Sequence, residues 1–341
     1  MDIRSDIGGK KPIYRQLLEQ IENDIREGRL LPGSLLPSMN ELADSLDISR
    51  ETVKKTYGIL RDRGFVVPQQ GKGFYVADRD AGARPRILVL FDKFSIYKQI
   101  LYNSIAEEFG PRAELTVLTH DQSLDLFAHY LDMYLGAFDY YIVIPHFPLD
   151  AASQGRAAKL VSRIPYPKLV LVDYLPEHLP GHYGAVYQDF EHDVCEGLRQ
   201  GLDKLRQTAG LHVITLPTSL YGPVMRKGIA RFCEDNGIPV RFSTAPPERI
   251  EKGETFLILN SQLDWGLAAL ARRIKAQGLA VGEDVFVIAY NDVDLNEVVL
   301  GGLTTVSTDF RLMGRTAARM ILDRRFEKIH CPFRMNRRST F

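Results

Sequence analysis

The stretch SRETVKKTYGILRDRGFVVPQQGKGFYV, residues 49–76, determines the predicted fold of the N-terminal part of the chain. Its first half is typical of an amphipathic helix, because Val53, Tyr57 and Leu60 recur at steps of three and four residues. Gly64 follows as a helix stop signal. Its second half consists of two short runs around a glycine-rich turn. The stretch therefore predicts a helix followed by a β-hairpin.

Two further helices are predicted upstream of this stretch. Between Pro12 and Glu27, apolar residues recur with the period of an amphipathic helix. Ser38 is followed three residues later by Glu41, which is the pattern of a capping box that opens a short helix. Since this helix and the one after Ser49 lie close together along the chain, they predict a helix-turn-helix, and the following hairpin is its wing.

Local charge distinguishes this region from the rest of the chain. The whole sequence has 43 basic and 43 acidic residues, whereas residues 49–72 carry six basic residues against two acidic ones. Arg50 lies near the start of its helix, where a guanidinium could donate two hydrogen bonds to a guanine in the major groove. A charged helix face is more often only solvated, and on charge alone that interpretation is the stronger one.

The order of the motifs favours DNA binding. From Pro12-Ile-Tyr-Arg-Gln through Ser49-Arg-Glu-Thr-Val to Gly71-Lys-Gly-Phe-Tyr-Val, the sequence closely resembles the DNA-binding domain of the GntR family of regulators. The resemblance implies that the second helix, the third helix and the wing contact DNA. The residues expected at the DNA are Ser38, Asn40, Ser49, Arg50, Thr52, Lys54, Gln70, Gly71 and Lys72. Asn40 stands where that family often has Arg, so the base preference at this contact is not implied.

A different pattern begins after a short polar segment. Residues 78–85 read DRDAGARP, which is typical of a linker, and we expect a DNA-binding domain over 1–78, a linker over 79–85 and a second domain over 86–341. In the second domain, apolar runs alternate with helix-like segments and start near residues 87, 115, 139, 168, 211, 255 and 284. This alternation predicts an α/β fold with parallel sheets.

Polar residues follow these apolar runs where each strand is expected to end. Asp92 and Lys93 follow the first run, His146 the third and Asp173 the fourth. Asn260 follows the sixth run and Asp292 the seventh. Because ligands of such sheets bind outside the carboxyl ends of the strands, the sequence predicts a common binding crevice there.

The C-terminal part carries a second resemblance. Ala289-Tyr-Asn-Asp, Leu303-Thr-Thr-Val-Ser-Thr-Asp-Phe and Met313-Gly-Arg resemble the effector domain of LacI-type regulators, which is related to periplasmic sugar-binding proteins. The resemblance implies a two-lobed α/β domain. The effector contacts that we expect from it and from the strand ends are Lys93, Tyr97, His146, Asp173, Arg226, Asn260 and Asp292.

Two departures from the LacI-type pattern concern this predicted site. The arginine that usually clamps the sugar falls on Met225, with Arg226 adjacent, and Asn260 is followed by Ser261 where Asp is usual. A sugar also needs an apolar plate for its C–H face, for which the candidates are Tyr97, Phe147 and Tyr290. For any single aromatic residue, packing in the core is the more frequent role.

The two resemblances together predict a ligand-responsive transcriptional regulator. We expect a homodimeric repressor of a sugar-utilisation operon that binds double-stranded operator DNA with an inverted repeat. Arabinose-type repressors combine these two families, so the expected effector is a neutral monosaccharide similar to arabinose or fucose. A phosphorylated or non-sugar metabolite is the alternative effector.

Other function classes fit the sequence less well. A fusion to an enzyme that uses pyridoxal phosphate would need a larger second domain, and no GxSxG, HExxH or GxxxxGK[ST] motif occurs. We expect no enzyme activity, no cofactor and no metal, because the three cysteines are far apart and lack a CxxC pair. The polar N-terminus argues against a secreted binding protein, and no apolar run is long enough for a membrane span, so a cytoplasmic location is expected.

Overall fold

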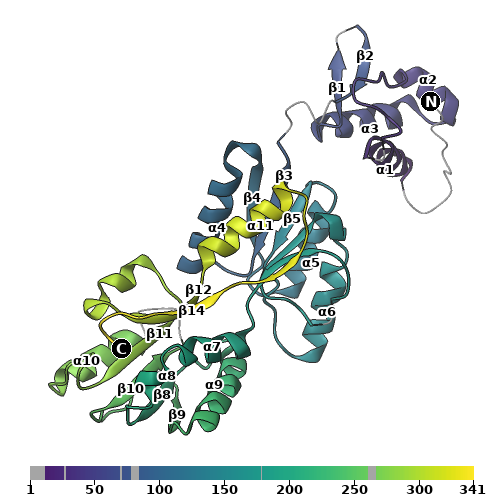
Figure 1. Cartoon of the computed structure of the whole chain (residues 1–341). Coiled ribbons are helices and arrows are strands. Elements are labelled where there is room, and N and C mark those ends of the chain that lie inside the picture. The colour runs from purple at the N-terminus through teal and green to yellow at the C-terminus, as the bar shows by residue number, and fades with distance from the viewer. Residues whose placement is uncertain (1–11, 27, 70, 78–83, 178, 260–265) are drawn as a thin grey trace. The chain divides into compact units, whose positions relative to one another are not determined.

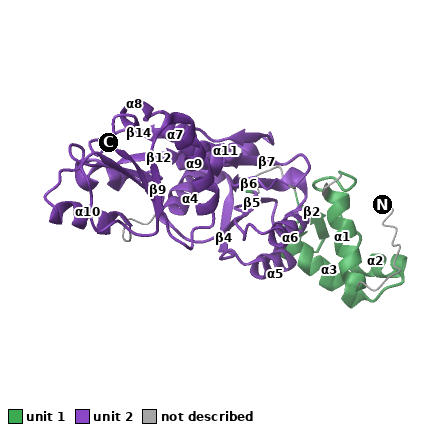
Figure 2. Ribbon diagram, turned by 90° about the horizontal axis from the view of Figure 1, so that it is seen from below, with its two compact units in different colours: residues 1–84 green, residues 85–341 purple. Residues whose placement is uncertain are grey.

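The computed structural model describes residues 12–26, 28–69, 71–77, 84–177, 179–259 and 266–341. The chain divides into two compact units, residues 1–84 and 85–341 (Figure 2). Most of the predicted linker, 79–85, lies outside the described residues. In the described part of the chain, no helix is both long enough and apolar enough to cross a membrane.

The first unit has the predicted three helices and hairpin. Its elements are α1 (Ile13–Arg26), α2 (Met39–Leu46), α3 (Arg50–Asp62), β1 (Val66–Gln69) and β2 (Gly73–Val76). The two strands pair in antiparallel register.

The core of this unit is formed by the apolar helix faces that the sequence predicts. Ile21 of α1 and Val53, Tyr57 and Leu60 of α3 are buried together. The Tyr57 hydroxyl donates a 2.8 Å hydrogen bond to the carbonyl of Pro37, so the ring is buried without leaving its polar end unpaired.

Local caps define the ends of α2 and α3 and the short turn between them. The predicted capping box is confirmed: Ser38 Oγ accepts from the backbone N–H of Glu41, and the Glu41 carboxylate accepts from that of Ser38. Asp47 ends α2 in a left-handed conformation, with φ of 51°. Ser49 then caps α3 by accepting from the Thr52 N–H at 3.1 Å. The short turn between the helices is thus defined by side chains adjacent in sequence.

The second unit is built from two lobes, each with a six-stranded sheet (Figure 1). The sheet of lobe 1 has the strand order β13-β7-β6-β5-β3-β4. Its strands are β3 (Arg86–Phe91), β4 (Glu114–Thr119), β5 (Tyr140–Val143), β6 (Leu169–Asp173), β7 (Gly184–Tyr187) and β13 (Lys328–His330). Its helices are α4 (Ile96–Phe109), α5 (Leu124–Tyr134), α6 (Ala151–Val161) and α11 (Phe310–Leu322). Helix α11 packs against α4, as Figure 1 shows.

The sheet of lobe 2 has the strand order β14-β12-β11-β10-β8-β9. Its strands are β8 (Gly210–Ile214), β9 (Val240–Ser243), β10 (Glu254–Ile258), β11 (Phe286–Tyr290), β12 (Thr304–Thr308) and β14 (Phe333–Asn336). Its helices are α7 (Phe190–Arg199), α8 (Leu202–Leu205), α9 (Gly222–Asn236) and α10 (Gly266–Ala276). The neighbouring strands are parallel in both lobes except β12 and β14, which are antiparallel.

The predicted α/β class is confirmed, and each of the seven apolar runs forms a strand. Five strands of the second unit were not predicted: β7, β9, β12, β13 and β14. The chain crosses between the lobes after β7, after β12 and after β13. Because these crossings are adjacent to the strand ends, residues from both lobes meet at one place.

Candidate functional site

The DNA-facing surface predicted for the first unit begins on α3. Arg50, the first residue of this helix, is exposed, and within the described residues its side chain has no hydrogen bond or ion pair. Lys54 is exposed one turn later and lies 3.3 Å from Glu51. Exposed cationic side chains near the start of such a helix are available for phosphates and base edges in a major groove.

The predicted hydroxyl and amide contacts lie next to Arg50 and on α2. Ser49 Oγ and Thr52 Oγ1 are 2.8 Å apart, so each hydroxyl is oriented by the other. Asn40 is exposed on the first turn of α2, directly after the exposed cap Ser38 and Met39.

The wing supplies the remaining predicted contacts. Gly71 has φ of 74°, a conformation that favours glycine, and the N–H of Lys72 donates to the carbonyl of Gln69 at 3.0 Å. Gly71 and Lys72 are both exposed at this turn. Gln70, also predicted to contact DNA, lies outside the described residues.

The second unit has a cavity of about 270 Å³ between its lobes, called here the central cavity. Lobe 1 lines it at the ends of β3 and β6 and in the segment after β5, with Asp92, Asp173 and His146. Lobe 2 lines it with the segment 216–221 before α9 and with Tyr290 at the end of β11. The central cavity therefore lies where the sequence predicts a crevice, at the carboxyl ends of the parallel strands.

A buried cluster of charged side chains forms the lobe 1 wall. The Lys98 ammonium pairs with Asp173 and lies 3.4 Å from Asp92 Oδ1. His146 lies between the carboxylates, with Nδ1 3.3 Å from Asp92 Oδ2 and Nε2 3.4 Å from Asp173 Oδ2. All four side chains are less than a tenth exposed. Charges so deeply buried persist only when they are paired, and here each carboxylate meets both Lys98 and His146.

The electrostatics of this cluster keep its groups ionised. Burial alone would raise the pKa of Asp92 and of Asp173, but Lys98 and His146 outweigh it and hold both pKa values below the ordinary value for Asp. Burial would lower the pKa of Lys98, and the two carboxylates raise it instead. Apart from His146, the cluster thus carries two negative charges and one positive charge.

A chain of hydrogen bonds leads from this cluster into lobe 2. The side-chain amide of Gln188, at the crossing after β7, donates to Asp173. The Tyr290 hydroxyl, at the end of β11, donates to Gln188 Oε1 at 3.4 Å. The charged cluster is thereby connected to both lobes.

Aromatic rings and unpaired polar atoms form the part of the cavity lining called here the lobe 2 wall. The Phe190 and Tyr221 rings are stacked with centroids 3.9 Å apart and 11° between their planes. The Tyr221 ring also meets the edge of His146 at 5.0 Å. The Tyr221 hydroxyl and Asn291 Oδ1 are buried and have no hydrogen-bond partner within the described chain. Such atoms are costly unless a ligand or water satisfies them.

The structure brings four of the seven predicted effector contacts to the central cavity: Lys93, Tyr97, His146 and Asp173. Tyr290, one of the predicted plates, lines it as well. Asn260 lies outside the described residues.

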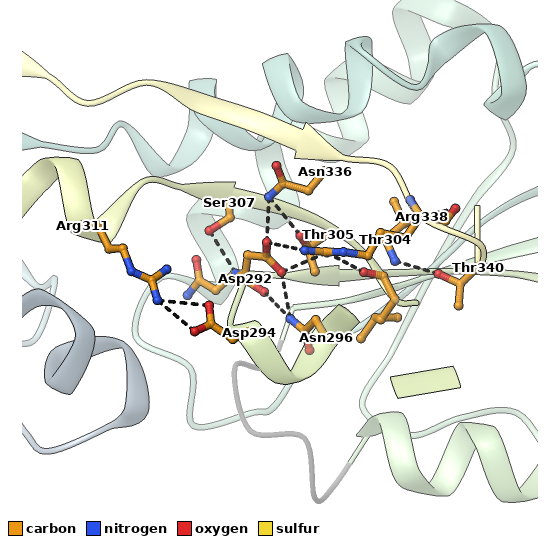
Figure 3. A network of polar contacts seen from close by, with 12 residues as sticks. Asp292, Asp294, Asn296, Thr304, Thr305, Ser307, Arg311, Asn336, Arg338 and Thr340 are labelled. Atoms are coloured by element: carbon orange, nitrogen blue, oxygen red, sulfur yellow. Dashed lines mark hydrogen bonds and ion pairs between the residues drawn. The ribbon is translucent and has the colours of Figure 1, made fainter. Parts of the chain in front are cut away.

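Asp292 does not line the central cavity, which corrects the sequence expectation. Its carboxylate is held by Arg338 through two contacts of 3.0 and 2.9 Å and accepts from Asn336 at 3.0 Å (Figure 3). The preceding residue, Asn291, lines the cavity instead. Asn291 has φ of 70°, and this left-handed turn at the strand end separates the directions of the two side chains.

One other predicted contact, Arg226, and one predicted apolar plate, Phe147, also lie elsewhere. Arg226 is exposed on α9, with its guanidinium 4.5 Å from the centroid of the Phe242 ring, whereas its neighbour Met225 lines the central cavity. Phe147 is fully buried in lobe 1, stacked on His120 at 4.6 Å, so it forms core rather than a plate. The helical turn at α9 explains the first difference, because adjacent helix residues point in different directions.

Sequence reasoning missed several cavity residues: Lys98, Gln188, Phe190, Tyr221 and Asn291. Lys98 could have been found from the sequence, because a lysine within the apolar segment IYKQIL is unexpected in a buried helix face. Phe190 and Tyr221 stand at helix starts, where sequence alone does not distinguish a ligand plate from core packing.

Two family models match segments of the chain, one in each unit. Residues 13–76 match the model described as bacterial regulatory proteins, gntR family, and residues 216–332 match the periplasmic binding protein-like domain. A similar relative is the uncharacterized HTH-type transcriptional regulator YurK of Bacillus subtilis (strain 168), 32% identical over 114 residues, which are 33% of this chain and 43% of that protein. The first curated relatives are matched over only 15% to 57% of their own length.

Solved structures share the fold of the second unit. One is a periplasmic binding protein/LacI transcriptional regulator from Alkaliphilus metalliredigens QYMF complexed with D-xylulofuranose, with a TM-score of 0.55 and 14% identity over 75% of this chain and 98% of that one. Another is the lac repressor dimer bound to operator and the anti-inducer ONPF, with a TM-score of 0.57 and 17% identity over 78% of this chain and 99% of that one.

The relatives and neighbours named here are described as regulators of transcription, and none of them is described as an enzyme. The chain thus joins a winged helix-turn-helix that matches the gntR family model to a two-lobed α/β domain, part of which matches the periplasmic binding protein-like model and which shares the fold of solved LacI-type regulators.

Proposed function

We propose that this protein is a cytoplasmic, ligand-responsive transcriptional regulator in which a small neutral sugar in the central cavity controls DNA binding by the first unit. The observation that carries the proposal is the central cavity itself, which is lined both by a cluster of mutually paired charged side chains and by stacked aromatic rings. The domain limits that we adopt are 1–78 for DNA binding, 79–85 for the linker and 86–341 for the effector.

The chemistry of the central cavity favours a polyhydroxylated ligand. Carboxylates and amide oxygens accept hydrogen bonds from hydroxyl groups, and Lys98 and His146 can donate to them. The Phe190 and Tyr221 rings provide an apolar surface for a C–H face, and a volume of about 270 Å³ suits a monosaccharide. A phosphate would meet two buried carboxylates against one ammonium, so a neutral sugar similar to arabinose or fucose is preferred.

The first unit supports the proposed DNA partner, and exposed apolar side chains of the second unit support a proposed homodimer. The exposed Arg50 side chain at the start of α3 suits a guanine in the major groove of double-stranded operator DNA. In the second unit, Phe94 and Val298 are 74% and 70% exposed, and Ile96 and Leu295 are also exposed. A second copy of the chain would cover these side chains, and a two-fold homodimer matches an inverted-repeat operator.

The regulatory step would be a shift between two lobe arrangements. A sugar that contacts the lobe 1 cluster and the lobe 2 wall together has a different affinity for an open and a closed arrangement, and only that difference can alter DNA binding. Release of DNA by the sugar would make the protein a repressor of a sugar-utilisation operon.

Thermal unfolding of the full-length protein against a panel of sugars tests the ligand. A ligand that binds only the folded state raises the unfolding midpoint as its concentration rises. We expect one neutral monosaccharide, such as L-arabinose or L-fucose, to do so. If no neutral sugar raises the midpoint and a non-sugar metabolite does, the assignment of a sugar is wrong.

An Arg50→Ala variant tests the DNA-binding unit. The free energy of binding to the operator should weaken by about 1–3 kcal/mol if Arg50 reads a base. Arg61→Ala is the matched control, because Arg61 is an exposed arginine near the other end of α3 and pairs with Asp62. Equal DNA affinity for wild type and Arg50→Ala would remove α3 as the recognition helix.

A further inference from the structure

We propose that the second unit has a second binding site, for a small phosphate-type anion, in a cavity separate from the one assigned to the sugar. This cavity has a volume of about 250 Å³ and is called here the hinge cavity. Its lining includes Ile100 of α4, Arg311 and Arg315 of α11, Asp294, and Arg334 of β14. Elements of both lobes therefore meet in it.

The acidic groups of the hinge cavity already have partners: two are paired with arginines, and the third accepts a hydrogen bond from a backbone N–H. Asp292 is held by Arg338 and Asn336, as described above (Figure 3). Asp294 accepts two hydrogen bonds of 3.0 Å from Arg311 (Figure 3). Asp309 caps α11 by accepting from the N–H of Leu312 at 2.8 Å.

Two basic groups of the same cavity are not compensated. Within the described residues, neither the Arg315 nor the Arg334 side chain has a hydrogen bond or an ion pair. With Asp292 paired to Arg338 and Asp294 to Arg311, these two guanidinium groups outnumber Asp309, the one lining carboxylate that has no cation partner within the described residues. Guanidinium groups bind phosphate oxygens through paired, charge-assisted hydrogen bonds, so an anion with several oxygens is the ligand class that these residues fit.

The backbone brings the two arginines toward one place. Arg315 lies one helical turn after Arg311, on the same face of α11. Arg334 is the register partner of Ser307 in the β12–β14 pair, and β12 ends just before α11 begins. Helix α11 packs on lobe 1, whereas β14 belongs to the sheet of lobe 2.

An anion bound by both arginines would link the lobes. It would stabilise the lobe arrangement in which Arg315 and Arg334 approach each other, and so would act as a second input to regulation. This site does not depend on sugar binding in the central cavity, because the two cavities use different charged residues.

Calorimetric titration of the full-length protein with inorganic phosphate, at constant ionic strength set by chloride, tests this inference. We expect saturable binding that Arg315→Gln and Arg334→Gln each weaken by about tenfold or more, since each removes a charge-assisted pair. Arg272→Gln is the control, because Arg272 is an exposed arginine on α10, outside the hinge cavity, and the variant should bind as wild type does.

The outcomes separate the two sites. Equal phosphate affinity in wild type and both glutamine variants, or no binding above the chloride background, would overturn the inference.

If a glutamine variant fails to fold, Arg315→Lys and Arg334→Lys give the same comparison, because lysine keeps the charge but loses the paired geometry. Tighter binding of glucose 6-phosphate than of inorganic phosphate would identify a phosphate ester, and the reverse would identify the free anion. Neutral-sugar binding should stay unchanged in all these variants.

Discussion

The central cavity and the hinge cavity both lie where the two lobes of the second unit meet, but they handle charge in opposite ways. In the central cavity the charges are paired among themselves. Within the described residues its buried atoms without a hydrogen bond are Asp92 Oδ1 and His146 Nε2, which still lie in ion-pair contacts, and the Tyr221 hydroxyl and Asn291 Oδ1, which belong to neutral groups. In the hinge cavity each carboxylate accepts a hydrogen bond, and within the described residues the side chains without partners are the cations Arg315 and Arg334. The difference teaches that the unpaired groups, rather than all polar groups present, indicate which ligand a cavity suits.

The largest effect is expected from removing the central cation. Lys98→Met removes the ammonium that both buried carboxylates share and leaves them only His146 in common, which should reduce the free energy of unfolding by about 3–5 kcal/mol. Urea unfolding measures this loss. Lys93→Met is the matched control, because Lys93 lines the same cavity but is exposed, and its effect should stay within about 0.5 kcal/mol. Similar stabilities of the two variants would mean that the buried pairs do not stabilise the fold.

Acidification should weaken the same cluster. Asp92 and Asp173 have pKa values below the ordinary one for Asp, so their contribution to stability is fully present above about pH 4 and is lost as the pH falls from there through their folded-state pKa values. Unfolding free energies measured from pH 6 down to pH 2 should therefore fall less steeply for Asp92→Asn than for wild type. Parallel curves would contradict the depressed pKa of Asp92.

A smaller effect is expected from the unpaired hydroxyl. Tyr221→Phe keeps the stacked ring and removes only the oxygen, so the affinity for the sugar should weaken by about 3- to 10-fold, in line with one neutral hydrogen bond. Calorimetric titration measures it, with Arg226→Gln, at an exposed position outside the cavity, as the control. Unchanged affinity in Tyr221→Phe would place the sugar away from this wall.

The smallest effects are expected at Asn291 and Asp292, where two variants test which of the two side chains contacts the sugar. Asn291→Gly removes the amide while keeping the positive φ accessible, and should weaken sugar binding by a few-fold, about 1 kcal/mol. Asp292→Asn should leave sugar affinity within about twofold, because that carboxylate contacts Arg338 and Asn336 instead. The opposite ranking would restore Asp292 as the effector contact.

The first unit could be predicted almost completely from its sequence, because its caps, stops and apolar stripes act between neighbours in the chain. The capping box at Ser38 and the cap at Ser49 are examples, since both partners lie within three residues. The strands of the second unit were predicted only where they are apolar. The Thr-rich β12 is buried but does not form an apolar run, and β9, β13 and β14 are partly polar strands at sheet edges.

The central cavity could be predicted only in part, because its residues come from segments far apart in sequence. His146 and Asp173 could be predicted from the sequence because each stands at or just after the end of an apolar strand. The choice between Asn291 and Asp292 depends on a positive φ that no sequence period reveals. Lys98 pairs with Asp173 across 75 positions, a contact that only the folded sheet creates.

The most direct test of the account is the effect of the sugar on DNA binding by the full-length protein. Fluorescence anisotropy with the DNA upstream of its own gene would measure affinity with and without the neutral sugar that raises the unfolding midpoint. The account predicts that this sugar changes the DNA affinity by about 5- to 150-fold, and that Tyr221→Phe requires more sugar for the same change. A sugar that binds the protein yet leaves the DNA affinity unchanged would contradict the proposed control of the first unit by the central cavity.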